Sequence, residues 1–167
     1  MSKKIIIFFI VIILMILGVY IISSGSFNNQ IGDNGENSSN LDDVNINNNT
    51  KIRITVDDKV TTATLIDSET TRDFVSLLPL TLDMDDLFGR EKYVNLPRPI
   101  SENSERTENY EVGDIIYWPP GQDIAIFYNH DGQTIDGGVI TIAKLDNGSE
   151  LFNVSGNINN VRIELIE

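Results

Sequence analysis

The chain has 167 residues, with 12 Lys or Arg, 25 Asp or Glu and no Cys. This length predicts one compact domain with room for appendages. The net charge of -13, without a basic patch, argues against nucleic-acid binding. The lack of Cys excludes disulfides, thiolate metal sites, Cys nucleophiles and a lipid-carrying Cys.

An apolar run at residues 5–22 predicts a membrane anchor over residues 1–22. As a helix it would reach about 27 Å, close to the roughly 30 Å of a bilayer core. Lys3 and Lys4 precede the run and favour a cytoplasmic amino end, so we expect a single-pass membrane protein whose remainder lies outside the cytoplasm. The alternative is a signal segment cleaved after Ile22 and a secreted protein, although no A-x-A pattern is present.

Residues 23–50 are rich in Asn, Ser and Gly and have no apolar period, which predicts a flexible linker. Residues 51–167 form the predicted globular domain. The first 50 residues hold two of the bases and four of the acids, which leaves 10 bases and 21 acids in this domain, a net charge of -11.

From residue 51 apolar and polar residues alternate, which is typical of strands half buried in a sheet. Ser68 is a suitable cap for a short helix with Phe74, Leu77 and Leu78 on one face, ended by Pro79. The predicted strands are 52–56 and 60–66, joined as a hairpin, then 80–84, 91–96, 114–118, 124–128, 139–145 and 161–166. This pattern predicts an all-β antiparallel barrel or sandwich.

Chemical motifs are sparse. A single His and no Cys make a metal site improbable, and the calcium-like segments at Asp83 and Asn129 have no acid at the twelfth position. His130 lies in a predicted turn, where a solvent-facing side chain is usual. We therefore predict no metal, no cofactor and no identifiable catalytic residue.

Aromatic residues are concentrated around the turn at Pro119-Pro120. Tyr117 and Trp118 precede this turn, and Phe127 and Tyr128 end the following segment. Because neighbouring residues of a strand face opposite sides of the sheet, one residue of each pair is expected in the core and the other on an accessible surface. Such a surface suits apolar or proline-containing peptides. The alternative is that all of these aromatics are ordinary core residues.

Several segments of the chain resemble the bacterial cyclophilin-like domain family. They are TATLIDSETTRDFVSLLPLTLDMDDLFGREKYVNLPR, VGDIIYWPPGQDIAIFY, and the closing GGVITIAKLDNG with NVRIELIE. The resemblance covers residues 51–167. It implies a closed eight-stranded antiparallel β-barrel with one or two short helices, related in fold to the cyclophilin prolyl isomerases, and we expect a monomer.

The sequence departs from the catalytic pattern of that fold. Cyclophilins carry Phe-His-Arg on the strand after the helix, whereas residues 91–96 here read EKYVNL, and their Gln-Phe-Phe segment is matched only loosely by residues 125–127. We therefore expect a domain that binds a peptide, protein or small ligand. The candidate ligand-binding residues are Arg98, Tyr117, Trp118 and Phe127. The alternatives are a prolyl isomerase that uses Arg90 or Arg98, and an accessory module of a redox or flavin protein.

Overall fold

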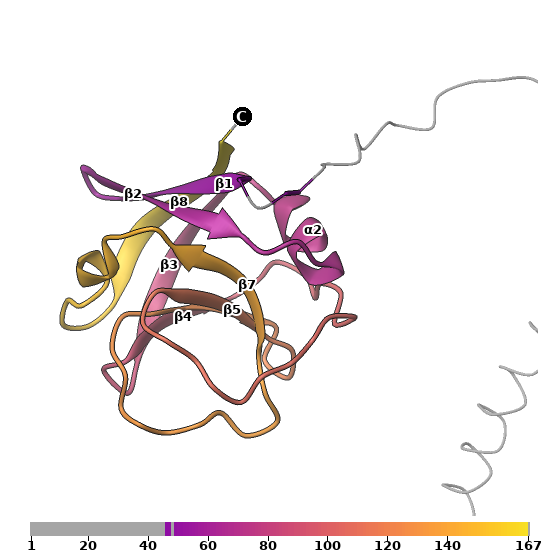
Figure 1. Ribbon diagram of the computed structural model, residues 1–167. Helices are drawn as coiled ribbons and strands as arrows, with labels where there is room; N and C mark the ends of the chain where they lie inside the picture. The colour runs from indigo at the N-terminus through magenta and orange to yellow at the C-terminus, as the bar shows by residue number, and fades with distance from the viewer. Residues whose placement is uncertain (1–45, 48, 167) are drawn as a thin grey trace, which may run out of the picture. The chain divides into compact units, whose positions relative to one another are not determined.

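A computed structural model of the protein describes residues 46–47 and 49–166. The predicted anchor at residues 1–22 and most of the predicted linker at residues 23–50 lie outside the described residues. Figure 1 shows the arrangement of the strands and helices. The elements are β1 (Lys51–Val56), β2 (Lys59–Leu65), α2 (Glu69–Val75), β3 (Leu80–Leu87), β4 (Glu91–Asn95), β5 (Asp114–Trp118), β6 (Asp123–Phe127), β7 (Ile140–Leu145), the 3-10 helix η1 (Ser149–Leu151) and β8 (Ile158–Ile166).

The eight strands form a closed antiparallel barrel in the order β1-β2-β7-β5-β6-β4-β3-β8, and pairing between β1 and β8 closes it. Closure leaves no sheet edge open to pairing with another chain. The predicted eight-stranded antiparallel barrel is therefore confirmed. In the part of the chain that the structure describes, no helix has the length and apolar character needed to cross a bilayer.

Alternation along the strands builds the barrel interior. In β1, Ile52, Ile54 and Val56 are buried in the core while Arg53 is exposed, as expected when successive side chains point to opposite faces. The predicted hairpin is confirmed by the register of β1 with β2. Ile46, which precedes the predicted domain, also packs in this core.

Helix α2 packs at one end of the barrel (Figure 1). It begins as predicted, because the Ser68 side chain accepts a hydrogen bond from the Thr71 backbone N–H at 3.1 Å. Phe74 is fully buried in the barrel core. The helix ends at Val75, so Leu77 follows it rather than continuing its face, yet Leu77 still packs against the core.

Strands β5 and β6 are buried on both faces of the sheet. Their inner residues join the barrel core, whereas Ile116, Ala125 and Phe127 belong to a second apolar cluster with Tyr110 and Val139. Tyr110 and Val139 come from segments outside these strands, so the connecting loops cover this part of the outer face. The candidate site lies against this second cluster.

Candidate functional site

The register of three strands creates a hollow on the outer face. Strand β6 lies between β4 and β5, and Ala125 is the register partner of Tyr93 in β4 and of Ile116 in β5. One row further along, Asp123 is the register partner of Trp118. Because Ala125 has a much smaller side chain than its neighbours in these rows, the middle of the face is left open.

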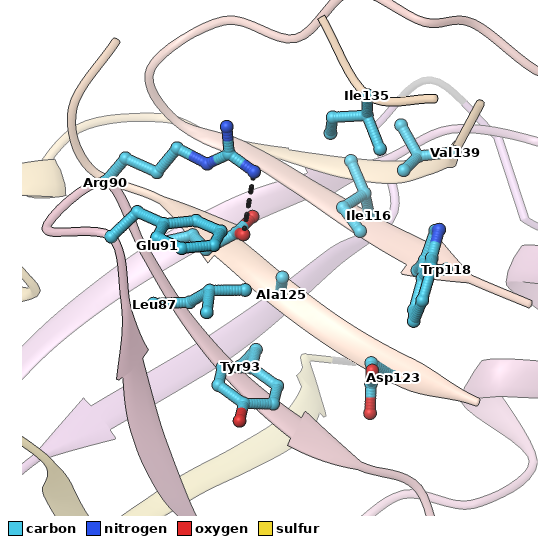
Figure 2. Close-up of a pocket in the computed structure, with 11 residues that line it drawn as sticks. Leu87, Arg90, Glu91, Tyr93, Ile116, Trp118, Asp123, Ala125, Ile135 and Val139 are labelled. Atoms are coloured by element: carbon cyan, nitrogen blue, oxygen red, sulfur yellow. Dashed lines mark hydrogen bonds and ion pairs between the residues drawn. The ribbon is translucent and has the colours of Figure 1, made fainter. Parts of the chain in front are cut away.

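The hollow is a pocket of about 390 Å³. Figure 2 shows Ala125 in the middle, the Arg90–Glu91 pair toward one end and Asp123 toward the other. Ligand sites commonly combine an apolar lining with a few polar groups. The pocket is lined by Leu87, Phe88, Arg90, Glu91, Tyr93, Ile116, Trp118, Asp123, Ala125, Ile135 and Val139.

Arg90 and Glu91 form a buried ion pair at one end of the pocket. Nη2 of Arg90 lies 3.3 Å from Oε1 of Glu91, and Nη1 lies 3.3 Å from Oδ2 of Asp131. The Arg90 guanidinium also lies over the rings of Tyr110, at 5.4 Å, and Phe127, at 5.8 Å. These contacts fix the guanidinium and pair its charge with two carboxylates.

Glu91 is buried, and only 5% of the surface of this residue is exposed. Burial raises the pKa of Glu91 above its usual range, and this effect outweighs the opposing effect of the neighbouring Arg90 guanidinium. The carboxyl group of Glu91 therefore lies in a poorly solvated position, which disfavours its charged form.

Asp123 marks the other end of the pocket and is 9% exposed. Its Oδ1 accepts a hydrogen bond from Nδ2 of Asn95 at 2.6 Å, and the same Nδ2 donates to the carbonyl of Gly121 at 2.7 Å. Burial raises the pKa of Asp123, and the hydrogen bond from Asn95 only partly offsets that effect. Asn95 thus ties the turn after β5 to the pocket carboxylate.

Gly121 has no room for a side chain. A Cβ at this position would collide with Oδ2 of Asp123 and would lie 2.7 Å from Cε3 of Trp118. Glycine in the Pro119-Pro120-Gly121 turn therefore lets the carboxylate and the indole ring lie where they do. The Pro119-Pro120-Gly121 turn, around which the aromatic residues of the sequence are concentrated, thus has a structural role in positioning Trp118 and Asp123.

Phe88 stands at the rim of the pocket, in the turn between β3 and β4. It is 78% exposed, and its φ of 57° is unusual for a bulky residue. Its ring lies 5.3 Å from Cζ of Arg90. An exposed aromatic residue in a strained turn beside a pocket is a candidate ligand contact.

The structure separates the four residues that the sequence suggested as a ligand-binding group. Trp118 lines the pocket. Phe127 lies in the adjacent apolar cluster and stacks on Tyr110 with ring centroids 3.9 Å apart. Tyr117 is fully buried in the barrel core. Arg98 lies beside helix α2 and donates to Oδ1 of Asp73 at 2.6 Å.

Most of the pocket was missed by sequence reasoning. Strand β4 supplies Glu91 and Tyr93, from the segment that stands where cyclophilins carry their catalytic motif. The alternation of β4 could have placed these two residues on one face with Asn95. The hollow at Ala125 has no local signal, because it depends on pairing with two other strands.

The polar groups of the pocket do not resemble a metal centre. Among residues 46–47 and 49–166, no group of three or more His, Asp or Glu side chains could hold a metal ion. The pocket instead offers apolar and aromatic surface between a paired guanidinium and a carboxylate.

Comparison with known proteins identifies the family. The model of the cyclophilin-like family matches residues 54–164. The fold is similar to the solution structure of the hypothetical protein AF2241 from Archaeoglobus fulgidus, with a TM-score of 0.57 and 22% identity over 70% of this chain and 95% of that chain. The comparison with curated proteins finds no match. Since the family match extends from β1 into β8 and the barrel closes as that fold requires, the chain belongs to the cyclophilin-like family.

Proposed function

We propose that this protein is a membrane-tethered, extracytoplasmic cyclophilin-like domain that binds a peptide or other small ligand in the pocket around Ala125. The observation that carries the proposal is the pocket itself. It joins an apolar floor and aromatic walls to ionisable groups that are almost fully buried.

Two buried donors add support. Nε of Arg90 and Nε1 of Trp118 have no hydrogen-bond partner among the described residues, and both side chains line the pocket. A buried polar group without a partner costs about 1–3 kcal/mol. A ligand acceptor that reached either donor would offset this cost.

The proposal is tested with a substitution that fills the pocket. In Ala125→Leu the larger side chain enters the hollow, so we expect affinity for any pocket ligand to fall at least about tenfold, while the free energy of unfolding changes by less than about 1 kcal/mol. Trp118 is the only Trp in the chain, so its fluorescence reports directly on the pocket. The full-length protein, purified in a neutral detergent, is titrated with a panel of blocked dipeptides and phenylalkyl compounds.

Thr55→Leu is the matched control, because it adds the same side chain to a partly buried position of β1, outside the pocket. Binding that is lost in Ala125→Leu and kept in Thr55→Leu supports the proposal. If every compound bound both variants with equal affinity, or none changed the Trp118 signal, the pocket would not be the binding site.

The apolar run at residues 5–22 and the two lysines that precede it support the membrane tether. We expect the full-length protein to sediment with membranes, to need detergent for release, and to be cleaved by protease added outside intact cells. Recovery of a soluble protein that begins after Ile22 would show a cleaved signal instead.

A second candidate function is prolyl isomerisation. The position of Arg90 in the pocket wall favours it, since a guanidinium there could stabilise a twisted prolyl amide. Arg98 lies outside the pocket and gives no such support. In a protease-coupled prolyl-peptide assay, acceleration that disappears in Arg90→Lys would favour this candidate. Our preferred proposal expects no acceleration.

A further inference from the structure

The two ends of the pocket differ in how their charges are matched. At one end, Arg90 is paired with both Glu91 and Asp131. At the other end, Asp123 forms no ion pair with any Lys, Arg or His of the described chain, and its one side-chain hydrogen bond comes from the neutral Asn95. Asp123 is therefore the pocket carboxyl group that has no cationic partner.

The surroundings of Asp123 suit a cation. Trp118 is its register partner across β5 and β6, and Tyr93 occupies the neighbouring row on the same face. Aromatic ring faces attract ammonium and guanidinium groups within about 6 Å, most strongly when the site excludes water. A cation between these rings and the carboxylate would be stabilised both by the aromatic faces and by the charge of Asp123.

Arg90 does not offer an equivalent site for an anion. Its guanidinium is already shared between two carboxylates and lies over aromatic rings. The whole chain, with a net charge of -13, also repels anions and concentrates cations near its surface. The charges within the pocket and the net charge of the chain therefore both favour a cationic ligand over an anionic one.

We infer that the pocket selects ligands that carry an ammonium or guanidinium group, bound at Asp123, with an apolar body lying over Ala125 between Tyr93 and Trp118. Amines, and peptides that present a Lys or Arg side chain, belong to this class. The inference rests on the proposed function, since it names the ligand class of that same pocket.

The test compares three probes that share a phenyl group and differ in charge. They are 2-phenylethylammonium, the neutral 2-phenylethanol and the anionic 3-phenylpropionate. Each is titrated into the full-length protein, with Trp118 fluorescence as the signal. We expect the cation to bind at least about tenfold more tightly than the alcohol, because hydrogen bonds to charged groups are the stronger ones.

Asp123→Asn separates charge from shape, because it preserves the size of the side chain and an oxygen that can accept from Asn95. We expect this variant to bind the cation and the alcohol with similar affinity. Asp58→Asn is the control, since it changes the net charge equally at an exposed position in the turn between β1 and β2.

Each outcome distinguishes this inference from the proposed function. Equal affinity for cation and alcohol in the unmodified protein, with binding still blocked by Ala125→Leu, would overturn the cation preference and leave the pocket as the ligand site. Tightest binding of the anion would overturn it in favour of Arg90 as the ligand's partner. A cation preference that survives Asp123→Asn would also contradict it.

Discussion

Phe88 is constrained by its backbone conformation and Gly121 by its packing, and both residues lie beside the pocket. Phe88 has a left-handed backbone with φ of 57°, and Gly121 admits no Cβ. Each therefore permits a prediction about a single substitution.

Phe88→Gly should be more stable than Phe88→Ala. Both variants lose the ring that lies over Arg90, but only glycine adopts a left-handed backbone without a steric cost. We expect a difference of about 1 kcal/mol in the free energy of unfolding, measured by denaturant titration. If alanine proved the more stable substitute, the left-handed conformation at this turn would be in doubt.

Gly121→Ala should displace Trp118 and Asp123, because the added methyl group would collide with both side chains. We expect a shifted Trp emission maximum, a loss of about 1–3 kcal/mol in the free energy of unfolding, and weaker binding of 2-phenylethylammonium. The control is Pro120→Ala, at the exposed neighbouring position of the same turn. An unchanged emission spectrum in Gly121→Ala would contradict the close packing described here.

Among the elements, β1, β2 and β7 are joined by one carboxylate. The Asp146 side chain, just after β7, accepts hydrogen bonds from Nζ of Lys51 at 2.6 Å, from Oγ1 of Thr64 at 2.7 Å and from Thr62. Although burial raises the pKa of Asp146, the hydrogen bonds from Lys51, Thr62 and Thr64 outweigh that effect and lower it to about 2. The ionised form is therefore favoured in the folded protein.

Because the folded-state pKa of Asp146 is depressed, its stabilising effect is present above the usual carboxyl pKa of about 4 and is lost as the pH falls toward about 2. We expect Asp146→Asn to lower the free energy of unfolding at pH 7 by about 1 kcal/mol, once solvent screening is allowed for. The difference from the unmodified protein should shrink between pH 4 and pH 2.

The control for this effect is again Asp58→Asn, which removes an exposed carboxylate elsewhere. Acid unfolding curves of the three proteins provide the measurement. A stability difference for Asp146→Asn that is the same at pH 7 and at pH 2 would mean that the carboxylate charge does not join these strands.

The strands were largely predictable because each carries a local signal. The alternation of apolar and polar residues predicts β1, and turn residues between most of the strands indicate where each strand ends. The end of α2 was not predictable from the apolar spacing of Phe74 and Leu77, since the helix stops at Val75. The depth of burial of β5 and β6 also needed the structure, because it depends on covering loops rather than on the strands themselves.

At the scale of the whole molecule, the resemblance to the cyclophilin-like family predicted the fold, but the site depends on contacts between distant segments. Alternation showed that Tyr117 and Trp118 face opposite sides without showing which side is the interior. Tyr117 proved to face the core, and Trp118 the pocket. Arg98 lies apart because Asp73 and Ser76, on the α2 segment, accept its hydrogen bonds.

The proposed ligand site lies on the outer face of β4, β6 and β5. Nuclear magnetic resonance tests it most directly, by mapping the backbone amide shifts of the full-length protein during titration with 2-phenylethylammonium. We expect the changes to gather around Ala125, including Tyr93, Trp118 and Asp123, and to vanish in Ala125→Leu. Changes that centred instead on α2 and Arg98, or that persisted in Ala125→Leu, would contradict the assignment of the ligand site to this face.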